Sequence, residues 1–194
     1  MDNEKAAAQR VCPWWLGYFL ASPVRKLQYN PRTILAPYVK QGMTVLDFGS
    51  AMGFFSIPLA QMVGPAGKVI CVDMQEKMLA RLKKRAQKAG VSAQIETRLC
   101  AQNSFGLEPL AGKIDFVLLF AVAHEVPARE ALFAALASVL KAGATLLVAE
   151  PKGHVSAENF ARTLAIAKEQ GFVEVGAPQI SRSRAILLQR APAH

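Results

Sequence analysis

Cysteine is scarce in this sequence, and a long apolar run is missing. The 194 residues contain three widely spaced cysteines, Cys12, Cys71 and Cys100. Their odd number and the lack of a Cys-x-x-Cys spacing favour reduced thiols in a cytoplasmic protein and give no metal signature. The longest apolar run near the start, residues 11–21, is too short to span a bilayer. Asp2 and Glu4 stand where a secretory signal would be positive, so we expect neither a membrane span nor a signal peptide.

Acidic residues are also few, 14 against 23 basic ones, which gives a formal net charge of +9. This charge permits an anionic partner without selecting one. Much of it lies in residues 81–88, which have the pattern of an amphipathic helix. The inner stripe of that helix would be Met78, Leu82, Ala86 and Ala89. Because no aromatic residues interleave with the basic ones, we expect a solvated helix face, and nucleic acid is the less favoured partner.

Apolar strand-like runs alternate with helical patterns along a chain that is 52% hydrophobic and 19% charged, as in a globular domain. Strands are expected near residues 43–48, 67–72, 93–98, 114–120 and 144–150, and helices near 54–63, 75–89, 127–141 and 156–169. Pro127 suits a first helical turn, and Ser156 an N-cap. The glycines expected just after helix ends are Gly90, Gly143 and Gly171.

The last two strands, near 172–179 and 184–190, are joined by a connection too short for a helix, so we expect an antiparallel pair at one sheet edge. The predicted fold class is α/β: a doubly wound, Rossmann-like, seven-stranded sheet with an antiparallel C-terminal hairpin. Residues 1–40 would form a helical preface, in which Asn30-Pro31 starts a helix, and residues 41–194 the main domain.

The stretch VLDFGSAMGFFS, residues 45–56, ends a predicted strand on Asp47 and turns through two glycines. A dinucleotide fingerprint requires three glycines as G-x-G-x-x-G, but Phe54 occupies the third position, which makes a nicotinamide site a weak interpretation. In open sheets of this kind, ligands bind at the carboxyl ends of the strands. The residues expected at that rim are the turn itself, Asp73, the segment after residue 98, His124-Glu125, and Glu150 through His154.

A strand-ending acid followed by G-x-[GA]-x-G resembles motif I of the class I S-adenosylmethionine-dependent methyltransferases. The resemblance extends from Asn30 to the final strand. It includes Asp73 closing strand two, residues 114–119 in strand four, Leu140-Lys-Ala-Gly143 before strand five, and the final hairpin. It implies a methyltransferase of the EC 2.1.1 type, with S-adenosyl-L-methionine as the cofactor.

The resemblance also implies a set of cofactor contacts. Asp47 would complement the positive charge of the methionine part, Gly49 and Gly53 would let the backbone approach closely, and the two oxygens of Asp73 would accept both ribose hydroxyls. Ala51 replaces the usual central glycine. The segment after strand three lacks the common Asp, so the adenine contact falls to backbone or Gln102. The full implied set is Asp47, Gly49, Ala51, Gly53, Phe54, Asp73, Met74, Ala101, Gln102 and Phe120.

Structural roles compete with these ligand contacts. Asp73 and Glu76 also have the spacing of a helix-capping pair, and Asp47 could act as a local turn residue. Asp115 lies early in strand four, away from the rim, and is expected to be structural.

His124 and Glu125, just beyond strand four, are the candidate catalytic residues, as a general base or substrate contact. No second histidine completes a zinc HExxH motif around them. His154 is a weaker candidate, Glu150 would face the pocket or bond the following loop, and a lone rim histidine can also be structural.

The acceptor is not indicated by any motif, and neither is the oligomeric state. A small-molecule acceptor is favoured over RNA or protein, and a cofactor-binding protein without transferase activity is a third alternative. Arsenic-methylating relatives of this fold depend on several cysteines. The three scattered cysteines of this sequence do not support that assignment. The aromatic segment at residues 12–20 could be a lid over the site or could pack into the core.

Overall fold

The structure, a computed structural model, describes residues 29–101 and 104–191. The predicted preface therefore enters it only from Tyr29 onward, and the aromatic segment at 12–20 lies outside the described residues. From this point Asn30 caps α3 (Pro31–Leu35), because its side-chain oxygen accepts hydrogen bonds from the backbone N–H groups of Arg32 and Thr33. The predicted helix start at Asn30-Pro31 is confirmed.

The seven strands form one sheet in the order β3-β2-β1-β4-β5-β7-β6. In chain order they are β1 (Thr44–Phe48), β2 (Lys68–Asp73), β3 (Ile95–Leu99), β4 (Ile114–Phe120), β5 (Leu140–Pro151), β6 (Phe172–Gly176) and β7 (Ser183–Arg190). Strands β1 to β5 pair in parallel, while β7 pairs antiparallel to both β5 and β6. The predicted fold class and the C-terminal hairpin are confirmed. The switch in strand order falls between β1 and β4.

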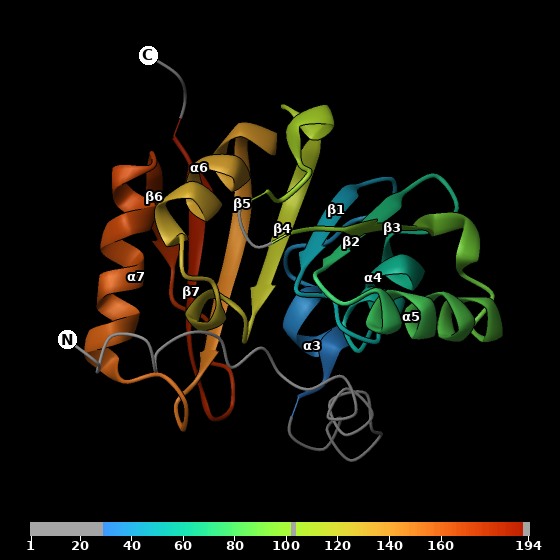
Figure 1. The fold of residues 1–194 in the computed structure, drawn as a ribbon, viewed down its shortest axis with the longest axis horizontal. Helices are drawn as coiled ribbons and strands as arrows, with labels where there is room; N and C mark the ends of the chain where they lie inside the picture. The colour runs from blue at the N-terminus through green and yellow to red at the C-terminus, as the bar shows by residue number, and fades with distance from the viewer. Residues whose placement is uncertain (1–28, 102–103, 192–194) are drawn as a thin grey trace.

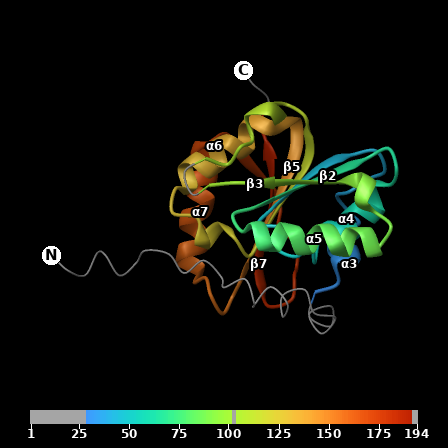
Figure 2. The ribbon, with the colours of Figure 1, turned by 45° about the vertical axis from the view of Figure 1, so that its right-hand side comes forward.

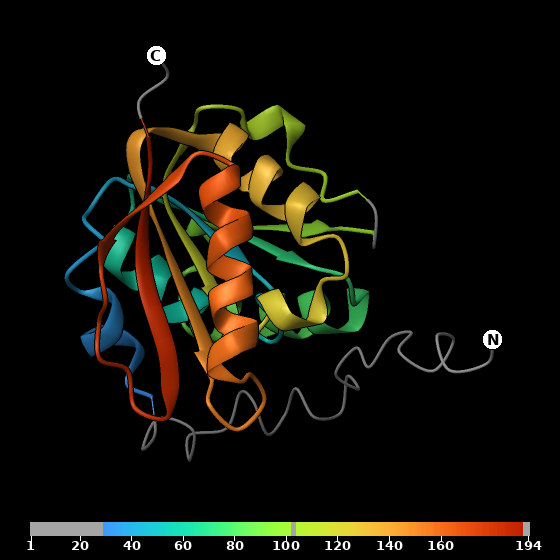
Figure 3. The same cartoon turned by 90° about the vertical axis from the view of Figure 1, so that its left-hand side faces the viewer.

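Helices cover both faces of the sheet (Figure 1). On one face lie α3, α4 (Ser56–Val63) and α5 (Glu76–Lys88), and α5 lies below β2 and β3 in the view of Figure 2. The other face is covered by α6 (Arg129–Val139) and α7 (Ala157–Glu169), which stand side by side in Figure 3. Short 3₁₀ turns are η2 (Ser92–Gln94), η3 (Glu108–Leu110) and η4 (Ala123–Glu125).

The core follows from this layering, because strands buried on both faces consist of near-continuous apolar runs. Strand β4 is the clearest case: all its residues except Asp115 are buried, and Phe116 stacks on Tyr38 from the α3 side. Two buried clusters result, one on each face of the sheet. The central strands are therefore rigid supports for whatever their carboxyl ends carry.

Several local signals act as predicted. The hydroxyl of Ser156 accepts a hydrogen bond from Asn159 N at 3.1 Å and caps α7. Gly90 and Gly171 follow helix ends in the left-handed region, with φ of +70° and +83°. Asp115 is structural: its carboxylate accepts from Thr44 N at 2.8 Å and from Lys141 Nζ at 2.5 Å, at the opposite end of the sheet from the rim.

The region around α6 differs from the prediction of a helix over 127–141. The helix begins at Arg129, so Pro127 lies before it, and Leu140 already pairs with Ile114 as the first residue of β5. Gly143 does not follow a helix end. It lies inside β5 at φ +74°, where the pairing with β4 is irregular, and a bulge there requires a residue that tolerates that conformation.

Element ends at the sheet edges also differ. A 3₁₀ turn takes residues 92–94, which delays β3 to Ile95, and β6 ends at Gly176 rather than at 179. On α5, Leu79 is buried and Ala89 is exposed, because Ala89 is already the C-cap of the helix. Residues at the ends of helices and strands have a weak periodic signal, so the sequence alone does not fix where these elements begin and end.

Candidate functional site

The turn after β1 is a tight backbone structure fixed to β2. The N–H groups of Gly49 and Ser50 both donate to Val72 O, at 2.9 and 3.0 Å. Gly49, Ala51 and Gly53 all have positive φ, at +78°, +46° and +80°. Ala51 therefore occupies a conformation that glycine adopts more easily, which gives a physical reason for the central glycine of the usual motif.

The two glycines of this turn are also required by packing within the protein. A Cβ on Gly49 would lie 2.6 Å from Cγ2 of Val122, in the loop after β4. A Cβ on Gly53 would lie 2.9 Å from Cγ of Leu82 on α5. The turn is thus pressed between the β4 loop and α5, so the loop that carries His124 lies directly against it.

Gly49→Ala is expected to destabilise the fold more than Gly90→Ala. Both positions have positive φ, but a Cβ on Gly90 meets nothing within 4 Å, whereas one on Gly49 overlaps the stiff side chain of Val122. Strain alone costs about 1 kcal/mol, and the overlap should raise the loss at Gly49 to about 2–3 kcal/mol. Urea denaturation of both variants measures this. Equal losses would contradict the close contact between the two loops.

Asp73, at the end of β2, supports the same turn. One carboxylate oxygen accepts from Ala51 N at 2.8 Å and the other from Gln75 N at 2.9 Å. The N-cap of α5 is Gln75, so Asp73 is not in the position of a capping residue, and the predicted alternative of a capping pair with Glu76 is wrong. Burial raises the pKa of Asp73, and its backbone hydrogen bonds partly oppose that shift.

The polar groups of the turn keep bonding capacity to spare. A carboxylate offers about four lone-pair sites, and the hydrogen bonds from Ala51 N and Gln75 N use one on each oxygen of Asp73. Ser50 Oγ is buried and has no hydrogen-bond partner within the described protein. Such an orphan hydroxyl usually has a missing partner. Sequence reasoning missed Ser50, although it is the only hydroxyl in the turn. These groups fit a polar, hydroxyl-bearing ligand such as the predicted cofactor.

Asp47 lies beneath the turn rather than on its surface. It is 3% exposed, and its carboxylate accepts a hydrogen bond of 2.5 Å from Ser56 Oγ, at the start of α4. Its negative charge is therefore placed under the glycine turn, where it can act on a ligand through the field it creates. A direct contact with the ligand stays a prediction.

The remaining predicted contacts differ in position. Met74, at the end of β2, is 42% exposed, and Ala101 is exposed beside Ser104. Phe54 and Phe120 instead are buried and pack on Phe55, with ring centroids 5.0 and 4.4 Å apart. Any role of these two rings would be to shape the wall under the rim. The predicted contact Gln102 lies outside the described residues.

His124 and Glu150 form a close pair across the ends of β4 and β5. Nδ1 of His124 is 2.6 Å from one carboxylate oxygen of Glu150, and the backbone N–H of His124 donates to the other at 3.3 Å. Glu150 is 1% exposed. Nε2 of His124 lies on the far side of the ring, 4.0 Å from the carboxylate of Glu125. The hydrogen bonds of Glu150 are thus with His124 and not with the loop that follows it, which was one of its two predicted roles.

The charges around this pair link it to the rest of the rim. The hydrogen bond that His124 makes to Glu150 raises the pKa of the histidine against the opposing effect of burial. Burial raises the pKa of Glu125, and the charges of Glu150 and Asp73 add to that shift while His124 opposes it. The charges of His124 and Asp73 both change the pKa of Glu125. The groups at the ends of β2 and β4 therefore interact electrostatically with one another.

Residues 29–101 and 104–191 can also be described by their possible metal ligands, cysteines and apolar helices. No group of three or more His, Cys, Asp or Glu side chains within that part could hold a metal ion. Cys71 and Cys100 are free and buried, and burial raises the pKa of Cys100 to about 11. No described helix has the length and apolar character needed to cross a membrane.

Known proteins resemble the chain both in fold and in sequence. A structure described as a SAM-dependent methyltransferase from Aquifex aeolicus superposes with a TM-score of 0.82 at 24% identity, covering 92% of this chain and 98% of that one. An arsenite methyltransferase of Halobacterium salinarum is 31% identical over 62% of this chain and 30% of its own length. The ubiquinone/menaquinone biosynthesis C-methyltransferase UbiE of Escherichia fergusonii is 30% identical over 61% and 46%.

The match to these two curated relatives spans less than half the length of each of them. A match to a whole domain family covers more of this chain: residues 39–181 match the family described as a methyltransferase domain. That range includes the glycine turn, Asp73 and the His124–Glu150 pair. The chain belongs to the class I S-adenosylmethionine-dependent methyltransferases, the family that its glycine turn and final hairpin predicted.

Proposed function

We propose that this chain transfers a methyl group from S-adenosylmethionine to a small organic molecule at the rim formed by the ends of β1, β2, β4 and β5. The observation that carries the proposal is the glycine turn. Its Ala51 N–H donates to one carboxylate oxygen of Asp73, while the other oxygen accepts from Gln75 N. Further lone pairs of that carboxylate and the buried Ser50 hydroxyl therefore stay available to a ligand.

Each residue at the rim then has a role that its position allows. When bound, the cofactor supplies a methyl group on a positively charged sulfur. Asp73 accepts the ribose hydroxyls, and the buried charge of Asp47 stabilises the positive methionine end from beneath the turn. Exposed Met74 and Ala101 border the adenine. His124 and Glu125 lie next to the acceptor, where the loop after β4 excludes water.

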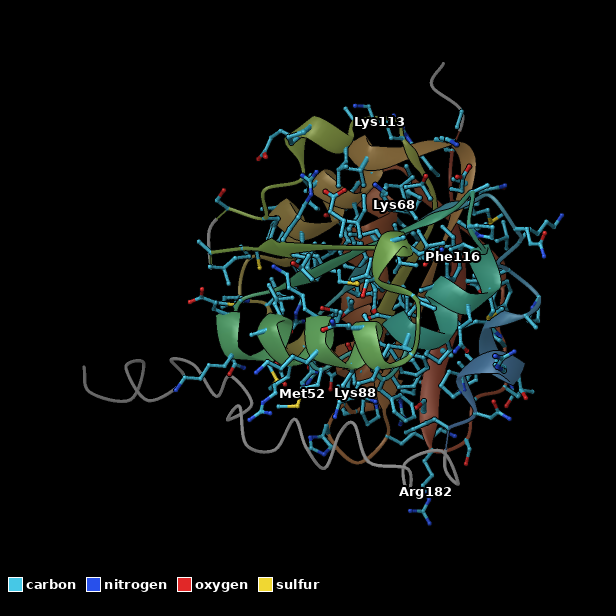
Figure 4. The ribbon with its side chains drawn as sticks, turned by 90° about the vertical axis from the view of Figure 1, so that its right-hand side faces the viewer. Met52, Lys68, Lys88, Lys113, Phe116 and Arg182 are labelled. Atoms are coloured by element: carbon cyan, nitrogen blue, oxygen red, sulfur yellow. The ribbon has the colours of Figure 1, made fainter. Side chains whose placement is uncertain are left out.

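The basic residues gathered on α5 follow a helix that leads away from the rim, which favours a small acceptor over a nucleic acid. In Figure 4, Lys113 and Arg182 lie at opposite ends of the molecule, and Lys68 and Lys88 lie apart from each other between these two ends. Helix α5 runs back from the rim, so its last basic residues lie away from the site. A nucleic-acid interface instead requires basic groups gathered on the face that carries the site.

The relatives support a small acceptor as well, since one is named for arsenite and the other for quinone biosynthesis. Of these two kinds, an organic acceptor fits this chain better. Arsenic is bound by thiolates, but the two cysteines among the described residues, Cys71 and Cys100, are buried, and burial raises the pKa of both.

Isothermal titration should show that the chain binds S-adenosylmethionine and S-adenosylhomocysteine, whereas NAD gives no heat. The glycine turn lacks the third glycine that a pyrophosphate requires, because Phe54 stands there and is buried. Incubation with S-adenosylmethionine labelled in the methyl group and a panel of phenols, quinols, arsenite and RNA identifies the acceptor class. Binding of NAD alone would contradict the assignment. Cofactor binding with no labelled product would indicate a binding protein without transferase activity.

A further inference from the structure

Glu150 is a buried carboxylate whose bonds all serve His124. Its side chain is 2% exposed, and its two oxygens accept from Nδ1 and from the backbone N–H of the same residue. A buried carboxylate is costly unless it is paired and hydrogen-bonded. Two bonds from one residue fix both the position and the orientation of the imidazole ring. No other residue of the rim is held in this way by the hydrogen bonds described.

This bond also selects the tautomer of the histidine. A carboxylate only accepts, so Nδ1 carries the proton, and in the neutral ring the lone pair is on Nε2. The His124 side chain is 25% exposed, and Nε2 is directed away from Glu150. Val122, two residues earlier, packs against Gly49 of the cofactor turn. The neutral ring therefore keeps its lone pair on the side that faces away from Glu150, in a loop that packs against the glycine turn.

We propose that Glu150 is a positioning residue that holds His124 as the general base for an acceptor hydroxyl. This inference rests on the proposed function and narrows its acceptor to weakly acidic hydroxyl compounds of the phenol type. In the step, the hydroxyl proton moves to Nε2 of His124 and the hydroxyl oxygen forms a bond to the methyl carbon. The bond from that carbon to sulfur breaks, with its electron pair left on sulfur. The imidazolium then returns its proton to water.

The charged groups around the ring are consistent with a base that is stabilised once it is protonated. Glu150 of β5 and Glu125 of η4 both raise the pKa of His124, with Glu150 the largest cause, while Arg129 of α6 lowers it. The ring of His154, from the loop after β5, lies 6.2 Å away. The carboxylates dominate, so the imidazolium formed in the step is favoured.

Glu150→Gln tests the proposal with two acceptors, 4-methylphenol and 4-nitrophenol, the second of which is already ionised at slightly alkaline pH. With 4-methylphenol, kcat is expected to fall by at least about tenfold, because the orienting carboxylate is lost. With 4-nitrophenol it should change little, since no proton has to be removed. Glu174→Gln, which makes the same exchange at an exposed position of the edge strand β6, is the matched control and should leave both rates unchanged. Equal losses on both phenols would show a merely structural role and overturn the proposal.

The rate with 4-methylphenol should also depend on pH in a stated direction. The base form of His124 accumulates as pH rises through its raised pKa, so the rate of the wild-type protein rises there. Glu150→Gln removes the largest cause of that shift, so the rising limb moves to lower pH while its plateau falls. An unmoved limb contradicts the assignment.

NMR titration of the imidazole in the protein without cofactor gives a readout that needs no turnover. It should report Nδ1 as the protonated nitrogen of neutral His124, and a lower pKa in Glu150→Gln than in wild type. Protonation on Nε2 instead would overturn the proposal. Failure of this inference is distinct from failure of the proposed function, which titration with S-adenosylmethionine tests. If the protein binds the cofactor and methylates arsenite but neither phenol, only the role of His124 as a base for hydroxyl groups is contradicted.

Discussion

Asp73→Ala is expected to weaken the binding of S-adenosylhomocysteine by about 1–3 kcal/mol, roughly a factor of 5–150 in Kd. The carboxylate is proposed to accept both ribose hydroxyls, and it also holds the glycine turn through Ala51 N at 2.8 Å. Both losses weaken binding, because without the Asp73 carboxylate the glycine turn is no longer held in the orientation that the ligand requires. Isothermal titration measures the change.

Asp115→Ala is the matched control for this variant. Asp115 is also a carboxylate of the sheet that accepts a backbone N–H, from Thr44 at 2.8 Å, but it lies at the end opposite to the rim. Both variants should unfold at a lower temperature, and only Asp73→Ala should lose affinity. An unchanged Kd for Asp73→Ala, with lower thermal stability, would show that Asp73 only supports the turn.

His124→Gln is expected to lower kcat with 4-methylphenol by about 10²–10⁴-fold, the usual contribution of a positioned general base. The Kd for S-adenosylhomocysteine should stay within about twofold, because binding of the nucleoside depends on other residues. Glutamine is preferred to alanine, since its amide can still donate to the buried Glu150. A wild-type kcat in this variant would remove His124 from the chemistry.

The same variant makes a prediction about stability. The pKa of His124 is raised in the folded protein, so its pair with Glu150 stabilises the fold fully below the ordinary histidine pKa. That stabilisation is lost as pH rises through the raised value. The difference in Tm between wild type and His124→Gln should therefore shrink from weakly acidic to alkaline pH. A difference that grows with pH would contradict the charged pair.

Periodicity and end signals predicted the fold well because they report local physics. The apolar run of β4, the cap at Ser156 and the short connection before β7 each require one structure whatever surrounds them. The bulge at Gly143 could not be predicted, because a glycine before a strand has the same appearance whether it ends a helix or interrupts a strand.

The candidate site was predicted in part for a similar reason. Asp73, His124 and Glu125 follow strand ends, so the topology alone brings them to one rim. The partners of these residues come from elsewhere in the chain: Glu150 is 26 positions from His124, and Val122 meets Gly49 only after β4 is placed beside β1. Such pairings depend on register, which a single sequence does not state.

A crystal structure of the protein with S-adenosylhomocysteine tests the central claim most directly. The account predicts that the ligand crosses the turn at Gly49–Gly53, with its ribose hydroxyls on the carboxylate of Asp73 and its sulfur on the side of the rim that carries Nε2 of His124. Ser50 Oγ should gain a hydrogen-bond partner. A ligand bound away from Asp73, or on the other edge of the sheet, would contradict the account.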